Sequence, residues 1–554
     1  MSYQRQVIWS VMVFIVVSIL VLGVRPMIQP DEPRNGIIAA EMVESGNWLS
    51  LRMAGFHYYE KPPLGYWMIA ASIQVFGENG FAIRLPSAIA TGIAALAAGI
   101  LAVRVSGRRE LGPLAFLVQA TTIGPLVLGT VANLDAMFSA WIALCLVAFY
   151  AACTAKGRNR IGWLAVAGAT SGLAFLTKGL LGLAIPGITA IAYLSWERRW
   201  LDLVRMPWIP LVTSLAIVAP VAVALHRSEP GFWEYFLVVE HFRRFASPDA
   251  NQHGEPWWYL IALLPVGALM WTLTWPRVWG GLRRAGDWKS GIRLAVAWIV
   301  APLAVLSMSA GKLPTYVLPL FVPIAVLVTL GLMRAHEQKL ALSTWSRLSG
   351  RWILRALAIV AFATAMTGTA WIGLATIWGA NPALHLIAIG CAMLIWAQID
   401  VWSWRATDAK SWLMRTATAP VAVLALIPYM YPDAFVRRTQ MPWSVLEAYE
   451  RALSESGILV STSQLGHCVC WVTGRRDILI VGRAGEFDNE LNLSQDSARL
   501  VTLEEVAIRI RAAPSGGIAV VTSPEDAKKL VETPGIASPA TQEIHGDIAI
   551  VVWK

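Results

Sequence analysis

The residues best suited to chemistry gather in a polar stretch, residues 25–63, that follows the first apolar segment. Within it stand Asp31, Glu32, Arg34, His57, Tyr58, Tyr59, Glu60 and Lys61. A loop that only joined membrane spans could be a few polar residues, and charges beside a membrane tend to be functional. Carboxylates beside cations are suited to acid–base work and to holding phosphate. We interpret this stretch as one wall of an active site; a solvated interfacial loop with aromatic anchors is the alternative.

Four more polar segments interrupt apolar runs and are expected on the same side of a membrane. They are Asn133-Leu134-Asp135, Thr177-Lys178-Gly179, the loop 226–256 with VEHFRRF at 239–245, and GKLPTY at 311–316. A single interfacial cation usually snorkels or pairs with anionic lipid. Several cations beside carboxylates favour a site that holds phosphate. The candidates are Arg34, Lys61, Lys178, Arg243, Arg244 and Lys312, together with Asp31, Glu60, Asp135 and His241.

Composition places the chain among polytopic membrane proteins. Of its 554 residues 56% are hydrophobic and only 14% are charged, and 27 are Trp. So few charged residues cannot cover the surface of a soluble protein of this size, and a soluble protein is therefore excluded. The net charge of +10 arises largely from basic residues in short loops, which is how a membrane protein fixes its orientation. No nucleic-acid partner is indicated.

The apolar runs predict about 13 spans, beginning with a retained helix at Val7–Val24. The others are Ile83–Val103, Leu111–Leu128, Asp135–Cys153, Ile161–Leu176, Leu180–Trp196, Pro207–Leu225, Trp257–Trp275, Ile292–Ser309, Tyr316–Leu332, Leu354–Trp378, Ala383–Trp402 and Thr416–Tyr429. This order places most Lys and Arg residues in cytoplasmic loops and the candidate site on the opposite, outer face of the membrane.

The apolar stretch Leu64–Phe76 is expected not to cross the membrane. As a helix it reaches about 20 Å, short of the roughly 30 Å hydrocarbon core. A crossing there would also turn the basic loops outward, against the positive-inside bias. We therefore predict a helix that lies in or dips into the outer leaflet, with residues 1–430 forming the transmembrane catalytic domain.

Residues 431–554 have a different composition and predict a small soluble α/β domain on the outer face of the membrane. Strands are expected in GILVSTS, CWVTGRRDILIVG, GIAVVTS and DIAIVVWK, and helices at Thr502–Ala512 and Pro524–Glu532. The domain contains no nucleotide-binding glycine loop, zinc pattern or nucleophile elbow. We predict a structural role for it, as a lid or a docking surface.

Several segments resemble the signatures of the lipid-A aminoarabinose transferases, a bacterial branch of the protein O-mannosyltransferase superfamily with the GT-C fold. The first are Asp31-Glu32-Pro33-Arg34, the stretch 57–67 (HYYEKPPLGYW) and Arg84-Leu85-Pro86-Ser87. The segments EHFRRF at 240–245 and SAGKLPTY at 309–316, followed by VLPLFVPIAVL, point to the aminoarabinose branch. The resemblance covers the membrane domain and leaves the carboxyl-terminal domain unmatched.

The resemblance implies a donor of undecaprenyl phosphate carrying 4-amino-4-deoxy-L-arabinose and an acceptor phosphate on lipid A, a modification that confers resistance to polymyxin and other cationic peptides. Lys61, Arg243, Arg244 and Lys312 would stabilise the leaving phosphate. Asp31 would orient or deprotonate the acceptor, and Asp135 and Glu60 are further catalytic candidates. Arg34, Tyr58, Tyr59, Lys178 and Tyr316 complete the expected substrate-binding set. Transfer would be a single in-line step with inversion.

Cofactor use and two other functions stay open. No cofactor is expected to be obligatory, but Glu60 and His241 are ligand types that zinc accepts; a hydrogen-bonded Glu–His pair is the alternative. A protein O-mannosyltransferase would share the fold and the acidic first loop, and would attach a neutral hexose to a hydroxyl. A lipid-linked sugar transporter is disfavoured because the ionisable residues gather at one membrane face and not near the midplane.

Overall fold

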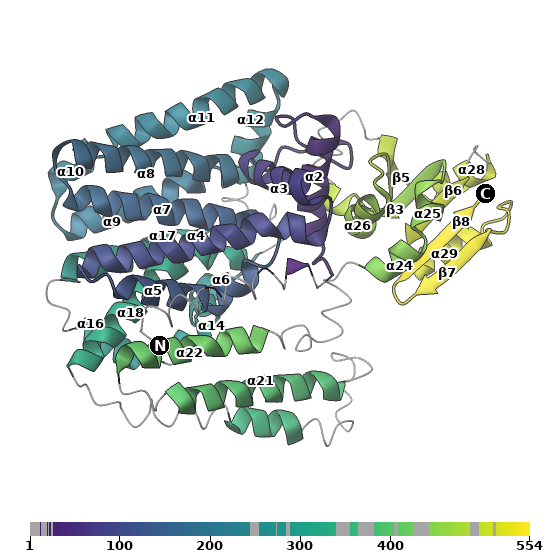
Figure 1. Cartoon of the computed structure of the whole chain (residues 1–554). Coiled ribbons are helices and arrows are strands. Elements are labelled where there is room, and N and C mark those ends of the chain that lie inside the picture. The colour runs from purple at the N-terminus through teal and green to yellow at the C-terminus, as the bar shows by residue number, and fades with distance from the viewer. Residues whose placement is uncertain are drawn as a thin grey trace. The chain divides into compact units, whose positions relative to one another are not determined.

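The fold is described from a computed structural model of the chain, and contacts between residues divide it into two compact units. The membrane unit comprises Met1–Arg25 and Arg84–Val436, and the mixed unit comprises Pro26–Ile83 and Arg437–Lys554 (Figure 1). The structure describes residues 12, 19, 22–23, 26–243, 254–272, 274–283, 288–338, 355–363, 382–403, 408–424, 442–487, 498–512 and 517–554. The predicted first span, Val7–Val24, therefore lies almost wholly outside the described residues.

The membrane unit is helical, as its apolar runs predict. In the described residues its elements are α4 (Gly80–Ser106), α5 (Leu111–Ala120), α6 (Ile123–Leu128), α7 (Leu134–Thr154), α8 (Gly157–Lys178), α9 (Leu181–Trp196), α10 (Trp200–Arg205), α11 (Trp208–Ser228), α12 (Phe232–Glu234), the π-helix η1 (Tyr235–Arg243), α14 (Tyr259–Gly267), α15 (Leu269–Thr272), α16 (Trp275–Leu282), α17 (Lys289–Met308), the 3-10 helix η4 (Pro314–Leu320), α18 (Phe321–Glu337), α21 (Pro382–Ser403) and α22 (Ala409–Leu424). Seven segments of the described chain are long and apolar enough to cross a membrane. The chain is therefore a multi-pass membrane protein, and the total of 13 spans stays a prediction.

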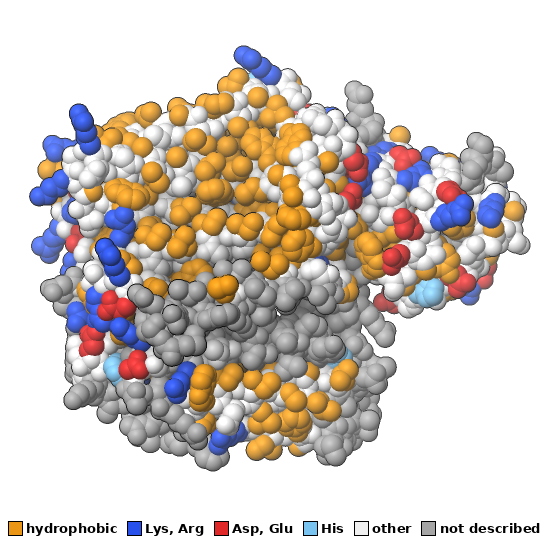
Figure 2. Space-filling view, viewed as in Figure 1, with side chains coloured by type: hydrophobic (Ala, Val, Ile, Leu, Met, Phe, Trp, Pro, Cys, Tyr) orange, Lys and Arg blue, Asp and Glu red, His pale blue; other side chains and the backbone are white. Residues whose placement is uncertain are grey.

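Large apolar side chains cover much of the outer surface of the membrane unit. On α11 the exposed set includes Leu211, Val212, Leu215 and Val223. Figure 2 shows a broad apolar surface over this unit, with Lys and Arg side chains at the end where α10 and α16 lie. In water an apolar surface of this extent would be a liability, whereas in a bilayer it faces lipid.

Ion pairs join the basic loops at that end of the membrane unit. Arg108, after α4, pairs with Glu337 at the end of α18, and Lys410 lies 3.9 Å from Glu110. Arg160 pairs with Asp202, and Arg293 lies 3.1 Å from Glu197 at the end of α9. The loops predicted as cytoplasmic thus meet at one end of the unit, opposite the start of α7 and the end of α8.

Glycines let α8 and α11 approach closely. An added Cβ at Gly168 would lie 2.3 Å from the carbonyl oxygen of Pro210, and one at Gly172 would lie 3.0 Å from that of Ser214. Small residues four positions apart allow such backbone contact between membrane helices. This packing fixes α8, whose last residue is Lys178.

Two of the predicted spans, Leu111–Leu128 and Trp257–Trp275, were wrong in being single helices, whereas Tyr316–Leu332 lies inside one candidate span, Pro314–Glu337. Leu111–Leu128 breaks between α5 and α6, where the Thr121 and Thr122 hydroxyls donate to carbonyls of the preceding turn, at 2.5 and 2.6 Å. Trp257–Trp275 is divided among α14, α15 and α16; Pro265 lies inside α14, and its carbonyl accepts from the Thr272 hydroxyl at 2.7 Å. Tyr316–Leu332 begins as the 3-10 helix η4, which contains two prolines.

Two late spans are only partly described. The helix at the predicted Thr416–Tyr429 begins earlier, as α22, because the Asp408 side chain accepts from the Ser411 amide at 2.9 Å and caps it. Of the predicted Leu354–Trp378, only 355–363 is described, and it is helical.

The carboxyl-terminal part of the mixed unit is an α/β sheet in the order β5-β4-β3-β6-β8-β7. Its strands are β3 (Ile458–Thr462), β4 (Leu479–Val481), β5 (Leu500–Val501), β6 (Ile518–Thr522), β7 (Thr541–His545) and β8 (Ile548–Trp553). The first four strands pair in parallel, and β8 pairs antiparallel with both β6 and β7. This confirms the predicted α/β fold of the carboxyl-terminal part.

Helices pack on both faces of this sheet. The helices α28 (Leu503–Arg511) and α29 (Pro524–Glu532) bury Val506, Ile510 and Leu530 against alternate residues of the strands. The helix α26 (Ser463–Thr473) packs on β3, β4 and β6, and on the short helices α24 (Trp443–Ala448) and α25 (Glu450–Ser454). The strand predicted over CWVT was therefore wrong: α26 is buried on nearly all sides, so its apolar residues run together without the spacing of a half-exposed helix, a pattern that also suits a strand.

The first polar loop folds in the same unit as this sheet. It forms α2 (Asp31–Ser45), the hairpin strands β1 (Arg52–Met53) and β2 (Phe56–His57), and α3 (Leu64–Phe76). Helix α3 has the predicted bounds, and α2 packs between α3 and α26. Gly36 on α2 is in contact with the Trp471 ring of α26: a Cβ at Gly36 would lie 2.5 Å from that ring.

Candidate active site

Asp135 is positioned by a polar junction at the start of α7. Asn133 caps this helix, its side-chain oxygen accepting from the Ala136 amide at 2.8 Å. Ser87 on α4 holds the cap residue, since its hydroxyl donates to the Asn133 carbonyl at 2.9 Å and accepts from the Asn133 amide at 3.2 Å. The motifs RLPS and NLD, which are separate in the sequence, thus meet in the structure.

Asp135, Lys178 and Tyr316 form one constellation in the membrane unit. Lys178 and Asp135 form an ion pair, with side chains that are 10% and 14% exposed. The Lys178 ammonium lies 4.8 Å from the centre of the Tyr316 ring, within range of a cation–π contact. Asp135 stands in the first turn of α7 and Lys178 in the last turn of α8, where the helix dipoles favour their charges. An ion pair beside an aromatic ring is an arrangement that could bind a charged sugar or a phosphate.

Lys312 is buried, and its ammonium is held by backbone. It donates to the carbonyls of Glu255 and Ser309, at 2.7 and 2.6 Å. Gly254 and Gly311 form a β-bridge at the same place. The loop 226–256 and the segment GKLPTY are thus joined where the sequence predicts a shared surface.

In the mixed unit, two buried tyrosines and Glu60 form a chain of hydrogen bonds. The Tyr66 hydroxyl donates to the Tyr58 hydroxyl at 3.1 Å, and Tyr58 donates to Glu60 Oε2 at 3.3 Å. Lys61 Nζ lies 3.8 Å from the same carboxylate oxygen. Burial raises the pKa of Tyr58 well above its ordinary value, and the hydroxyl stays protonated as a donor. The chain of hydrogen bonds fixes Glu60 beside a cation.

Asp31 and Arg34 are neighbours on the first turn of α2. They form an ion pair, and the Asp31 side chain is 54% exposed. Both interact electrostatically with the Tyr66 hydroxyl, which places them around the tyrosine pair. Glu32 points elsewhere: it is buried, and it accepts from the Ile28 amide at 2.7 Å.

The remaining candidates are only partly described. Tyr59 bonds to His57 Nδ1 at 3.3 Å. The backbones of His241 and Arg243 lie in the π-helix η1, but their side chains are outside the description, as is all of Arg244. Sequence reasoning missed Tyr66, Ser87 and Asn133 as supports of the candidate groups, although all three stand in motifs that it singled out.

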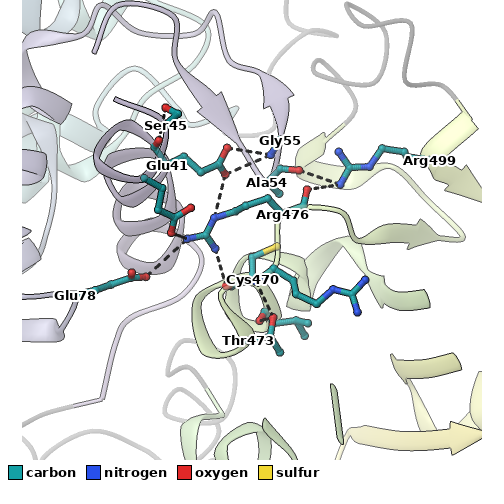
Figure 3. A network of polar contacts seen from close by, with 12 residues as sticks. Glu41, Ser45, Ala54, Gly55, Glu78, Cys470, Thr473, Arg476 and Arg499 are labelled. Carbon is teal, nitrogen blue, oxygen red and sulfur yellow. Dashed lines mark hydrogen bonds and ion pairs between the residues drawn. The ribbon is translucent and has the colours of Figure 1, made fainter. Parts of the chain in front are cut away.

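A second polar network joins helix α2 and the hairpin of the first loop to the carboxyl-terminal part of the mixed unit (Figure 3). Arg476, which follows α26, lies 3.6 Å from Glu41 and 2.8 Å from Glu44, both on α2, and 3.9 Å from Glu78. A cavity of 290 Å³ borders Glu41, Glu44, Arg52 and Arg476. Burial raises the pKa of Glu41 from 4.5 to about 7, although Arg476 and the amide of Gly55 oppose the rise.

This raised pKa predicts a pH-dependent stability. The folded protein binds the Glu41 proton more tightly than the unfolded chain does, so the free energy of unfolding falls as pH rises from about 4.5 to 7 and levels off above. The shift corresponds to roughly 3 kcal/mol. We expect Glu41→Gln to flatten the decrease in thermal midpoint between pH 5 and 8. The exposed Glu455→Gln is the control; equal slopes in wild type and Glu41→Gln would contradict the assignment.

Two family models match this chain. The family described as dolichyl-phosphate-mannose-protein mannosyltransferase matches residues 60–223, and the arabinosyl transferase ArnT carboxyl-terminal domain matches residues 437–552. Among solved structures, the crystal structure of ArnT from Cupriavidus metallidurans bound to undecaprenyl phosphate aligns with a TM-score of 0.81 and 22% identity, over 99% of this chain and 97% of that one. The apo form aligns equally, at 0.81 and 21%. The chain therefore has the GT-C fold of a glycosyltransferase.

Curated relatives assign the family. Undecaprenyl phosphate-α-4-amino-4-deoxy-L-arabinose arabinosyl transferases from Erwinia tasmaniensis and Pseudomonas aeruginosa are each 32% identical, over 91% of both chains. The one from Pseudomonas savastanoi pv. phaseolicola is 34% identical, over 91% of this chain and 92% of its own. This chain belongs to that family of arabinosyl transferases.

Proposed function

We propose that the chain moves 4-amino-4-deoxy-L-arabinose from undecaprenyl phosphate to a phosphate of lipid A, at the periplasmic face of the bacterial inner membrane. The observation that carries the proposal is the 32–34% sequence identity, over 91% of the chain, to curated transferases of this name. The gathering of basic loops at one end of the membrane unit supports the orientation, because such loops stay in the cytoplasm. Modified lipid A would bind cationic peptides such as polymyxin less well, since a positive amine is added to it.

The proposed step is an inverting displacement at the anomeric carbon. An oxygen of the acceptor phosphate attacks this carbon while its bond to the undecaprenyl phosphate oxygen breaks, and the leaving phosphate takes the electron pair. The products are a sugar phosphodiester on lipid A and free undecaprenyl phosphate. A proton still on the acceptor phosphate would pass to Asp31. Because the acceptor is largely ionised at neutral pH, Asp31 and Asp135 would also balance charge and bind the amine of the sugar.

We assign the leaving phosphate to Lys61, with Arg243 and Arg244, as the cations that stabilise its growing charge. Lys178 and Tyr316, with Arg34, Tyr58 and Tyr59, would bind substrate, and Glu60 would orient Lys61. Lys312 is a weaker candidate for binding the phosphate, because its ammonium already donates to two backbone carbonyls.

Lys61→Ala is expected to lower kcat/KM for the lipid-linked donor by about 10- to 100-fold. The side chain is only 21% exposed and lies 3.8 Å from Glu60, so thermal unfolding must confirm that the variant is folded. Steady-state kinetics with varied donor concentration measures the effect, and Lys61→Arg should keep most of the activity. Unchanged donor kinetics in Lys61→Ala would remove this residue from phosphate binding.

A zinc ion between Glu60 and His241 stays a proposal. In the described residues no group of three or more His, Cys, Asp or Glu side chains is placed to hold a metal. Metal analysis of the purified protein, before and after Glu60→Gln, distinguishes a bound ion from a Glu–His hydrogen bond. Stoichiometric zinc that is lost in the variant supports the site, and its absence from the wild type refutes it.

The donor tests the function itself. Purified enzyme should transfer sugar from undecaprenyl phosphate–aminoarabinose to lipid A and should not use polyprenyl-phosphate mannose. The reverse preference, with a hydroxyl acceptor, would identify a protein O-mannosyltransferase instead.

A further inference from the structure

The hairpin of the first loop has a turn that needs outside support. Strands β1 and β2 pair Met53 with Phe56, which leaves Ala54 and Gly55 as a two-residue turn with φ of 53° and 81°. This left-handed backbone is unfavourable for an alanine, and a two-stranded hairpin alone is marginal in water. A further bond, from the Tyr58 amide to the Leu51 carbonyl at 3.0 Å, extends the pairing. The position of Tyr58 is therefore tied to that of the hairpin.

Arg499, just before β5, holds the turn from the side of the sheet (Figure 3). Its Nη2 donates to the Ala54 carbonyl at 2.9 Å, and also to the carbonyls of Arg476 and Ile478, at 2.9 and 2.8 Å. Its guanidinium lies 3.7 Å from the centre of the Phe56 ring in β2. One side chain thus joins the hairpin to two backbone positions of the carboxyl-terminal domain.

Glu41 and Arg476 enclose the other side of the turn. The Glu41 carboxylate accepts from the Gly55 amide at 3.1 Å, and Arg476 pairs with Glu41. The Arg476 carbonyl approaches so closely that a Cβ at Gly55 would lie 2.8 Å from it. The turn is thus held between helix α2 and the carboxyl-terminal domain.

We propose that Arg499, assisted by Arg476, is a positioning residue for sugar transfer. It sets the place of the segment His57–Lys61 through the hairpin, and the carboxyl-terminal domain thereby fixes Lys61. This inference rests on the proposed role of Lys61 in donor binding. Arg is required because its planar fork engages several carbonyls and the Phe56 ring at once, which a Lys ammonium does not do.

The test compares Arg499→Lys with Arg475→Ala in the full-length protein. Arg475 is a near neighbour whose fork bonds to Asp477 and Ser456 within the carboxyl-terminal domain, so it is the matched control. Hydrogen–deuterium exchange over 51–61 is measured without donor, and kcat and KM for undecaprenyl phosphate–aminoarabinose are measured separately.

We expect Arg499→Lys to speed exchange at Gly55 and Tyr58 at least about tenfold and to lower kcat/KM for the donor about tenfold, while exchange in β3 and β6 stays as in the wild type. Arg475→Ala should leave the exchange of 51–61 and the kinetics unchanged. A folded Arg499→Lys protein with wild-type exchange over 51–61, or with faster exchange and wild-type kinetics, would overturn the proposal. If the wild type transfers no aminoarabinose, the proposed function fails, while the exchange result still reports whether Arg499 holds the hairpin.

Discussion

Asp31→Asn is expected to lower the rate of sugar transfer by about 10²- to 10⁴-fold, the usual loss when a general base, the role that we propose for Asp31, is removed. The amide has the shape of the carboxylate but accepts no proton and carries no charge. Because the side chain is 54% exposed, the free energy of unfolding should change by less than about 1 kcal/mol. The substitution should therefore change the transfer rate strongly and the stability of the fold only slightly.

Initial rates at saturating donor and lipid A measure this loss, and thermal unfolding in detergent checks the fold. Asp526→Asn is the matched control, an acid-to-amide change on α29 whose carboxylate pairs with Lys529. It should leave transfer unchanged. Full activity of Asp31→Asn would remove this residue from the mechanism.

Breaking the Asp135–Lys178 pair is expected to damage both stability and transfer. Lys178→Met leaves a nearly buried carboxylate without its cation, and removing one partner of such a pair costs about 3–5 kcal/mol. The double variant Asp135→Asn with Lys178→Met leaves no unpaired charge and should regain most of the stability. It should not regain activity, because the two charges that we propose to bind substrate are gone.

A double-mutant cycle separates these effects, with unfolding and transfer measured for each variant. The Arg160–Asp202 pair, at the basic end of the membrane unit, is the control cycle; it is more exposed, and its coupling should be below about 1 kcal/mol. Transfer should survive in those variants. Activity restored along with stability in the Asp135–Lys178 double variant would show that the pair is only structural.

Local patterns in the sequence predicted much of the fold. Helix α29 and helix α3 have the expected bounds, and β3, β6 and β8 lie inside the predicted strand segments. These elements carry strong periodicity with clear ends, such as the capping Ser523 before α29. The interruptions of two spans were not predicted, because they depend on Thr hydroxyls and prolines inside runs that are apolar throughout.

Residue types and the order of the spans predicted the candidate groups of the site. They did not predict the residues that hold those groups in position. Asp135 and Lys178 could be expected at one end of the bundle because α7 and α8 are consecutive. Tyr66 stands in an apolar helix, where a tyrosine is ordinarily expected to pack in the core. Nothing in the sequence around it predicts its hydrogen bond to Tyr58. Arg476 and Arg499 look like surface charges of a separate domain; only the fold shows that they hold α2 and the hairpin.

The proposed transfer to lipid A is tested most directly in bacteria that lack their own aminoarabinose transferase but still make its donor. The mass of their lipid A is measured with and without expression of this chain. We predict that expression adds the mass of one 4-amino-4-deoxy-arabinose residue to lipid A, and that Asp31→Asn, expressed at the same level, does not. Unmodified lipid A in cells that contain the folded wild-type protein and the undecaprenyl phosphate-linked sugar would contradict the proposed function.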